Sequence, residues 1–309
     1  IVKDVQDHAR SLVERKLTGH EKTMIWQEIP RMFKMTQPWE FYKDFFQWIG
    51  KKEMLVSHPG GKLEYADVFP FIYYKIRLEG IDHADVYQQV KHLIVDEMQD
   101  YTPVQYAVLS RVFRCKKTIL GDVSQTVNPY SASSAETIER IFPQADVVKL
   151  FRSYRSTLEI TAFTQSISRN PNIIPMERHG AEPTFRQHTS RSDQTAAIRK
   201  SIQDFGLSGH HSLGIICKTP RQAQELHQLI RDLDAHLLTA ENTSFRGSVI
   251  VTSVHLAKGL EFDEVIVCDV SSSNYGSDVD RSLLYIACTR AMHRLELHWV
   301  GEKSKFLDN

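Results

Sequence analysis

The stretch His92-Leu93-Ile94-Val95-Asp96-Glu97-Met98-Gln99-Asp100 decides the fold of this chain, because it joins an apolar run to a cluster of carboxylates. The apolar run predicts a buried strand, and the carboxylates then follow its carboxyl end. In open α/β sheets, ligands bind outside the carboxyl ends of the strands. Adjacent carboxylates there suit magnesium binding and the activation of a water molecule. An acidic turn after a strand is also typical of a solvated loop, so the other motifs must decide.

After residue 90 the pattern alternates between strands and helices, which predicts an α/β fold with parallel sheets and helices on both faces. A boundary near residue 150 separates two α/β lobes. The predicted strands are His92–Asp96, Thr118–Gly121, Val147–Leu150, Leu213–Cys217, Val249–Thr252, Val265–Asp269 and Leu295–Trp299. The predicted helices are Pro103–Phe113, Thr157–Ser168, Asp193–Phe205, Pro220–Asp234 and Val279–His293.

The first 58 residues read as helical and rich in aromatic residues. Apolar residues recur there at three- and four-residue spacing and predict one helical face that packs on a core. An interface with a partner is the alternative. The members of this stripe are Trp39, Tyr42, Phe45, Phe46 and Ile49. A further helix is predicted over Asp67–Leu78, with Pro70 in its first turn and Gly80 as its stop.

The composition describes a soluble globular chain of 309 residues, 41% hydrophobic and 25% charged, with a formal net charge of zero. Nucleic-acid binding therefore requires a local groove rather than the field of the whole protein. The four cysteines match no zinc spacing and are expected to be buried, reduced thiols. No apolar run is long enough to span a bilayer, which favours a cytoplasmic protein without membrane contact.

Two shorter motifs follow predicted strands. Gly121-Asp122 ends a strand, and the amide of Gln125 can hold a water molecule or a phosphate oxygen. In Phe151-Arg152-Ser153-Tyr154-Arg155-Ser156, the guanidinium of Arg155 suits a phosphate and the ring of Tyr154 can stack on a base. A surface arginine at a helix start is the structural alternative. The helix dipole disfavours an arginine there, which indicates an anionic partner.

Two longer motifs lie in the last quarter of the chain. Thr252-Ser253-Val254-His255-Leu256-Ala257-Lys258-Gly259-Leu260-Glu261-Phe262-Asp263 joins two strands through a short helical turn and is dense in polar groups. Such density favours binding to a polymer or a ribose over a polar connector. Leu283–Ala291 is predicted to be helical, with Leu283, Ala287, Arg290 and Arg294 on one side. An arginine on that apolar face needs a carboxylate or a phosphate partner.

In order and in spacing, these segments resemble motifs II to VI of superfamily 1 helicases of the UvrD/Rep type. The resemblance covers residues 90–300 and implies two RecA-like lobes with ATP bound between them. It implies that residues 1–90 are a helical, aromatic segment and an insertion of the first lobe. Residues 91–150 are then the remainder of the first lobe, and residues 151–309 the second lobe.

The resemblance also implies roles for individual residues. Asp96 would bind Mg²⁺, Glu97 would activate the hydrolytic water and Gln125 would sense the γ-phosphate. Arg155 and Arg290 would act as arginine fingers. The nucleotide would be bound by Tyr154 on the adenine, by Glu261 on the ribose and by Asp100. The implied nucleic-acid contacts are Tyr130, Thr252, His255 and Lys258.

The departures from the family are informative. The GxxxxGK[ST] segment that cradles phosphates in such motors is absent from the sequence, so the first lobe is incomplete. We expect that segment upstream of Ile1, and we expect this chain alone to be inactive. Ser153 stands where the family usually has asparagine. Arg155 and Thr252 are only 97 positions apart, too few for the large accessory domain of UvrD-type enzymes.

A motor of this reduced size, preceded by Lys62-Leu63-Glu64-Tyr65-Ala66-Asp67, most resembles the HelD branch. HelD proteins are bacterial ATPases that bind RNA polymerase and release it from nucleic acid. The leading hypothesis is therefore a HelD-like ATPase with ATP and Mg²⁺ as cofactors. Its partners would be single-stranded nucleic acid, DNA in particular, and RNA polymerase. The alternatives are a DNA-unwinding repair helicase of the UvrD or helicase IV kind and a non-catalytic binding module.

Overall fold

The computed structural model describes residues 6, 9–11, 13, 15–32, 37–56, 58, 62–81, 87, 89–122, 125, 135–242 and 247–308, with the side chains of 27–32 excepted. The chain divides into two compact units. Residues 1–93 and 102–118 form the N-terminal unit, and residues 94–101 and 119–309 form the C-terminal unit. The division into 1–90, 91–150 and 151–309 stays a prediction.

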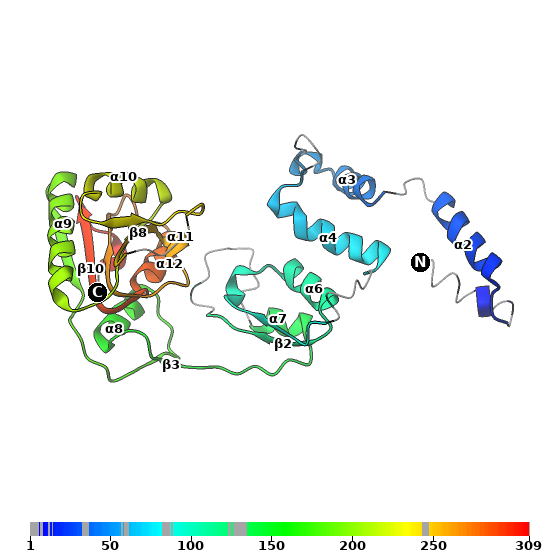
Figure 1. The fold of residues 1–309 in the computed structure, drawn as a ribbon, viewed down its shortest axis with the longest axis horizontal. Coiled ribbons are helices and arrows are strands. Elements are labelled where there is room, and N and C mark those ends of the chain that lie inside the picture. The colour runs from blue at the N-terminus through cyan, green and yellow to red at the C-terminus, as the bar shows by residue number, and fades with distance from the viewer. Residues whose placement is uncertain are drawn as a thin grey trace. The chain divides into compact units, whose positions relative to one another are not determined.

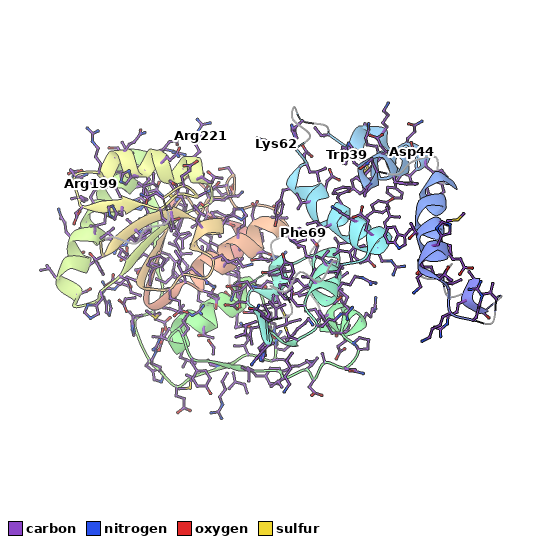
Figure 2. All side chains as sticks on the ribbon, turned by 45° about the vertical axis from the view of Figure 1, so that its right-hand side comes forward. Trp39, Asp44, Lys62, Phe69, Arg199 and Arg221 are labelled. Carbon is purple, nitrogen blue, oxygen red and sulfur yellow. The ribbon has the colours of Figure 1, made fainter. Side chains whose placement is uncertain are left out.

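The N-terminal unit is mainly helical. Its helices are α2 (Gly19–Met32), α3 (Pro38–Trp48), α4 (Tyr65–Glu79), α6 (Pro103–Val112) and the short 3₁₀ helix η1 (Lys52–Met54). Tyr42 and Phe46 of α3 are buried. The Tyr42 ring packs 5.3 Å from that of Phe71 on α4, and its hydroxyl donates to Asp67 Oδ1 at 2.9 Å. The expectation for the aromatic stripe is confirmed in part: Tyr42 and Phe46 pack on a core, but Phe45 and Ile49 are exposed. Figure 2 shows Trp39 and Asp44 on α3 and Phe69 on α4.

Helix α4 begins earlier than its sequence predicts. It starts at Tyr65, so Pro70 lies inside the helix and not in its first turn. Asp67 is buried against Tyr42 and does not serve as a cap, because its carboxylate accepts the Tyr42 hydroxyl. The predicted stop is confirmed: Gly80 has a φ of 85°, a backbone conformation that favours glycine.

The opening stretch forms β1 (His92–Val95) and the 3₁₀ helix η2 (Met98–Asp100). β1 belongs to a two-stranded sheet with β2 (Lys116–Ile119). The expectation of a buried strand is wrong: Ile94 is 66% exposed, and only Val95 of β1 is buried. An apolar run alone does not reveal whether a second layer covers it. A hydrogen bond fixes the turn after β1 to the residue that follows β2, since Met98 N donates to Leu120 O at 2.8 Å.

The C-terminal unit is built on a six-stranded sheet in which every pair of neighbours is parallel. This confirms the α/β class and is consistent with a RecA-like lobe (Figure 1). In spatial order the strands are β5 (Thr184–His188), β10 (Ala291–Val300), β9 (Phe262–Val267), β6 (Leu213–Cys217), β8 (Val249–Ser253) and β7 (Ala235–Leu237).

Helices cover both faces of this sheet. One face packs on α9 (Arg191–Ser208) and α10 (Pro220–Ile230), and the other on α8 (Leu158–Ile167), α11 (Val254–Ala257) and α12 (Asp278–Cys288). Side chains along β6 alternate between them, so Ile215 joins one apolar cluster and Ile216 the other. Gly214 sits where layers meet tightly: a Cβ there would lie 2.5 Å from the Phe262 ring.

Two predicted elements differ from the structure. Val147–Leu150 is not a strand; Leu150 is 89% exposed, and the chain pairs later, where β3 (Arg152–Ser153) meets β4 (Ile174–Pro175). The helix predicted over Val279–His293 ends at Cys288, because Arg290 O accepts from Phe262 N at 2.9 Å and β10 begins at Ala291. Arg290 and Arg294 therefore do not share a helical face.

The remaining described elements are α7 (Ala135–Ile141) and the 3₁₀ helix η4 (Lys305–Leu307). Arg199 of α9 and Arg221 of α10 lie on the surface of the helical layer (Figure 2). Arg199 Nη1 donates to Asp232 Oδ1 at 2.8 Å and ties α9 to the turn after α10. Within the described residues, no helix is long and apolar enough to cross a bilayer.

Candidate nucleotide site

The turn after β1 holds its carboxylates in a defined arrangement. Glu97 has a φ of 52°, in the left-handed region that side-chain-bearing residues rarely adopt. Its backbone N–H donates to Asp96 Oδ1 at 2.8 Å. The Gln99 side chain is fully buried and donates its amide to Glu97 Oε2. Local backbone strain of this kind clusters at functional sites, where the surroundings maintain it.

A second segment lies against this turn through the same amide. Gln99 Oε1 accepts from the backbone N–H of Asp122 at 3.0 Å. Asp122 Oδ2 in turn accepts from Gln125 Nε2 at 3.0 Å. Gly121 is required here, since a Cβ at this position would lie 2.5 Å from Gln99 Oε1. The predicted Gly121-Asp122 turn therefore lies directly against the acidic turn.

Arg290 lies between α12 and β10 and is only 1% exposed. Its Nη2 donates to Gln125 Oε1 at 2.6 Å, and its Nε donates to the carbonyl of Ile286 at 3.1 Å. Burial lowers its pKa to about 10, and the nearby charge of Arg155 acts in the same direction. The carboxylates of Glu97, Glu261 and Asp122 oppose this shift. Arg290 thus stays charged at neutral pH among three carboxylates.

Arg155 lies beside Arg290 and forms an ion pair with Glu261. Backbone contacts tie the two arginine segments together. The Ser156 hydroxyl donates to Ala291 O at 2.6 Å. Arg178 Nη2 donates to the carbonyls of both Arg155 and Met292, the latter at 3.2 Å. These hydrogen bonds therefore hold the backbone segments of Arg155 and Arg290 next to each other.

The Lys258-Gly259 loop contributes a further contact with the acidic turn. Lys258 Nζ forms an ion pair with Asp100. Gly259, with a φ of 80°, faces Glu97: a Cβ added there would lie 3.7 Å from Glu97 Oε1. Lys258, predicted as a nucleic-acid contact, is thus occupied by a carboxylate of the candidate nucleotide site.

Two of the other predicted nucleic-acid residues, Thr252 and His255, are described by the structure. Thr252, at the end of β8, is fully buried, and its hydroxyl donates to Leu238 O at 3.4 Å. His255 on α11 is exposed. Tyr130 lies outside the described residues. Tyr154 is 63% exposed and free to stack on a flat ligand. The structure therefore gathers the predicted catalytic residues, and Thr252 and His255 do not join them through any hydrogen bond or ion pair described here.

Sequence reasoning missed three residues of this site. Gln99 and Asp122 lie within the motifs, but the sequence indicates no role for either, because their link depends on how two strands meet. Arg178 lies in no motif, so no sequence signal pointed to it. All three act by holding neighbouring groups in place.

The carboxylates suit a magnesium ion of the kind that nucleotides carry. Mg²⁺ takes one or two protein carboxylates and fills its other positions with water and phosphate oxygens. Among the described residues, no cluster of three or more His, Cys, Asp or Glu side chains could hold a metal ion by itself. Asp96, exposed at the strand end, fits an ion that arrives with a nucleotide better than a permanent metal centre.

The end of the chain matches a known sequence family. Residues 248–297 match the family described as the UvrD-like helicase C-terminal domain. This stretch of the C-terminal unit is similar to a UvrD-like helicase C-terminal domain. This stretch includes β8, the Lys258-Gly259 loop and Arg290, so the family match falls on part of the candidate site.

Individual relatives agree with this domain. The chain is 30% identical over 130 residues to the ATP-dependent DNA helicase UvrD2 of Mycobacterium bovis, covering 38% of the chain and 19% of the relative. It is 30% identical over 90 residues to DNA helicase II of Escherichia coli K12, covering 28% of the chain and 12% of that protein. The chain thus spans about a fifth or less of the length of these relatives.

A solved structure is also similar. The crystal structure of the C-terminal domain of a possible DNA helicase from Lactobacillus plantarum WCFS1 is 32% identical, with a TM-score of 0.45. The match covers 50% of this chain and 92% of that one.

Since UvrD2 and helicase II are both named as DNA helicases, they support the UvrD-type alternative better than the HelD interpretation.

Proposed function

We propose that this chain is part of an ATP-dependent DNA helicase motor of superfamily 1. The observation that carries the proposal is the buried guanidinium of Arg290, which bonds Gln125 and lies among Glu97, Asp122 and Glu261. A buried arginine beside several carboxylates and a second arginine suits a ligand that carries both phosphates and a cation. The UvrD-like domain and the helicase relatives support the same function.

The chemistry proposed for this site is the transfer of the terminal phosphoryl group of ATP to water. Glu97 orients the attacking water and accepts its proton, and the Gln125 amide contacts the terminal phosphate. Arg290 and Arg155 stabilise the negative charge on that group as it is transferred. Mg²⁺, when bound with the nucleotide at Asp96, supplies a positive charge that offsets the charge of the phosphates.

The remaining proposed roles concern recognition. Tyr154 stacks on the adenine, and Glu261 accepts hydrogen bonds from the ribose. Since Glu261 is paired with Arg155 in this structure, nucleotide binding would exchange that ion pair for contacts with ribose and phosphate. Lys258 and Asp100 hold the loop after β8 against the acidic turn. Tyr130 and His255 are proposed to contact the nucleic acid. Thr252 is fully buried, so its proposed role is to support the end of β8 next to that path.

The test is ATP hydrolysis by this chain beside the longest protein that contains it, with and without single-stranded DNA. The sequence provides no GxxxxGK[ST] phosphate cradle, so we expect activity in the longer protein alone. We also expect stimulation by single-stranded DNA and a steep loss of DNA affinity with added salt. Absence of both hydrolysis and nucleotide binding from both proteins would leave a non-catalytic binding module.

A HelD-like role is the second candidate, and the short segment between Arg155 and Thr252 supports it. In this structure that segment runs through α8, α9, α10 and the strands between them, which belong to the lobe itself. Unwinding of a tailed duplex would favour a UvrD-type DNA helicase. Co-purification with RNA polymerase, without strand separation, would favour the HelD-like role.

A further inference from the structure

A continuous chain of hydrogen bonds runs from the acidic turn to the buried arginine. It passes from Glu97 to Gln99, from Gln99 to Asp122, from Asp122 to Gln125 and from Gln125 to Arg290. Three links join two side chains, and the link between Gln99 and Asp122 joins the Gln99 side chain to the Asp122 backbone N–H. The residues come from three separate stretches of the sequence. The carboxylate at one end and the guanidinium at the other are two of the charged groups on which the proposed hydrolysis depends.

Gln99 and Asp122 are the members of this chain that no motif assigns a role, and Gln99 is the one whose side chain contacts both neighbouring members. Its side chain is fully buried, and each end of its amide has one defined partner. The nitrogen donates to Glu97 Oε2, and the oxygen accepts from the backbone N–H of Asp122 at 3.0 Å. A buried amide of this kind is costly to disturb, because removing one partner leaves the other unsatisfied.

The surroundings of Gln99 allow its amide little freedom. Its Oε1 fills the space that a Cβ on Gly121 would occupy, 2.5 Å away. Its partner Glu97 has a φ of 52°, which residues with a side chain rarely adopt. Contacts with the surrounding residues must therefore hold Glu97 and its carboxylate in place. Gln99 supplies such a contact directly to the carboxylate.

We propose that Gln99 is a positioning residue: it fixes the Glu97 carboxylate and links it to the segment of Asp122 and Gln125, and through them to Arg290. The catalytic part of this inference rests on the proposed function, since it assumes that Glu97 activates water. The link itself does not, because it is a property of the folded chain. Loss of Gln99 would leave the nucleotide contacts intact and misdirect the carboxylate.

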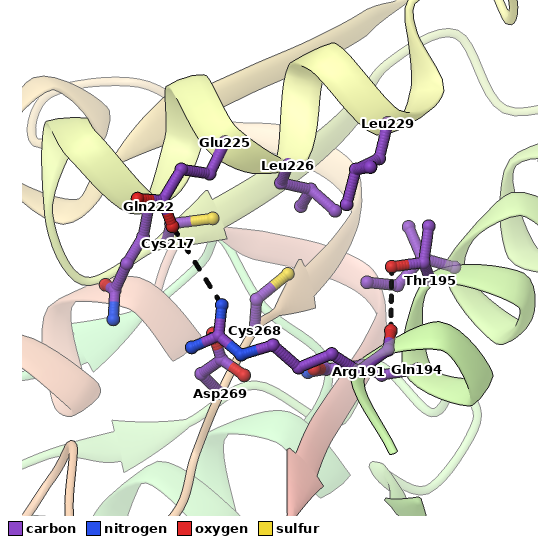
Figure 3. A pocket seen from close by; sticks show the side chains of 11 residues that line it. Arg191, Gln194, Thr195, Cys217, Gln222, Glu225, Leu226, Leu229, Cys268 and Asp269 are labelled. Carbon is purple, nitrogen blue, oxygen red and sulfur yellow. Dashed lines mark hydrogen bonds and ion pairs between the residues drawn. The ribbon is translucent and has the colours of Figure 1, made fainter.

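A matched control exists in the same unit. Gln194 on α9 is also buried, at 5% exposure. Its amide donates to Asp269 Oδ1 at 2.9 Å and accepts from Asp269 N at 3.2 Å in the orientation that satisfies both groups. Asp269 has a φ of 54°, close to that of Glu97. Figure 3 shows Gln194 and Asp269 beside a small cavity under α10, a set of residues separate from the candidate site.

The first experiment uses the chain itself and does not need hydrolysis. Gln99→Met keeps the side-chain length and removes both hydrogen bonds. We expect hydrogen exchange at the Asp122 amide to rise about tenfold or more, with no such rise in Gln194→Met. If Gln99→Met leaves the hydrogen-exchange rate of the Asp122 amide unchanged, the proposed link between Gln99 and Asp122 is wrong. Thermal melting of both variants shows whether each is folded.

The second experiment is a double-mutant cycle on ATP hydrolysis in the longest protein that contains the chain. Gln99→Met should lower kcat about 10–100-fold with KM for ATP nearly unchanged. In a Glu97→Gln background the same change should have no further effect, because Gln99 acts through Glu97. If Gln99→Met lowers kcat equally in the wild-type and Glu97→Gln backgrounds, or if Gln194→Met lowers kcat as much, Gln99 has only a general structural role. Either result would contradict the proposal that Gln99 positions Glu97. A wild-type protein without hydrolysis contradicts the proposed function and leaves the exchange measurement to decide the link.

Discussion

Arg290 Nη2 lies 2.6 Å from Gln125 Oε1, although the two residues are 165 positions apart in sequence. One follows the last helix before β10, and the other follows the second strand of the small sheet. The amide thus joins the second motif of the series to the last one within the C-terminal unit. Because Arg290 is 1% exposed, its charge has no access to bulk water and depends on this amide and on the surrounding carboxylates.

Replacing Arg290 should separate binding from turnover. In the longest protein that contains the chain, we expect Arg290→Ala to lower kcat by about 10³-fold, with nucleotide affinity within a few-fold of wild type. Arg290→Lys should recover little, because lysine lacks the planar fork of donors. Arg281→Ala on the exposed side of α12 is the control and should keep full activity. Normal turnover in Arg290→Ala would remove this residue from the active site.

Glu261 should discriminate between nucleotides by their ribose. We expect wild-type protein to bind ATP more tightly than 2′,3′-dideoxy-ATP by about 10–100-fold, since hydrogen bonds to a charged group are strong. In Glu261→Ala the two affinities should become equal. Isothermal titration with both nucleotides measures this. Discrimination that persists in the variant would assign the ribose to another residue.

Acid should weaken the C-terminal unit through Glu296. Burial alone would raise the pKa of this carboxyl, but hydrogen bonds from His298 and Ser201 and the charge of Arg186 lower it from 4.5 to about 2. A lowered pKa stabilises the fold above pH 4.5, by about 3 kcal/mol at most, and this contribution disappears as the pH falls towards 2. Urea unfolding at a series of pH values should show Glu296→Gln less stable than wild type at pH 7.

The difference between wild type and Glu296→Gln should close between pH 4.5 and pH 2. The exposed Glu182→Gln provides the control and should follow wild type throughout. A gap that stays constant over that range would mean that the ionised carboxylate does not contribute to stability.

Two glycines of the C-terminal unit should respond oppositely to alanine. Gly214→Ala places a Cβ 2.5 Å from the Phe262 ring and should destabilise the fold by about 1–3 kcal/mol. Gly206 lies inside α9 with nothing within 4 Å of the added carbon, so Gly206→Ala should stabilise by about 0.5–1 kcal/mol. Chemical denaturation measures both. Equal effects of the two changes would contradict the packing described between β6 and β9.

The sequence predicts the class of the larger sheet well, because strands such as Leu213–Cys217 are continuous apolar runs buried on both faces. It misses β5 because Thr184-Phe185-Arg186-Gln187-His188 is an edge strand with polar residues. It extends α12 too far because Ala291-Met292-His293 has no local signal that separates helix from strand. That choice is made by the hydrogen bond between Phe262 N and Arg290 O, which joins distant parts of the chain.

For the candidate site, the motifs anticipate the neighbourhood of Glu97, Gln125, Arg155, Glu261 and Arg290, and their chemical roles stay proposals. What no motif could indicate is how these groups are held. The position of Gln99 depends on the approach of residues 121 and 122 to the acidic turn. The role of Arg178 depends on two carbonyls that are 137 residues apart in the chain.

The buried cysteines of the C-terminal unit can report when that unit opens, because their thiols must become exposed before they can react. Cys217 ends β6, Cys268 directly follows the neighbouring strand β9 and Cys288 ends α12, and all three are buried. Burial raises the pKa of the Cys288 thiol, which makes it still less reactive towards alkylating reagents. Cys115 in the N-terminal unit is only partly buried. Alkylation of the three buried thiols therefore reports the opening of the C-terminal unit, without any label added to the protein.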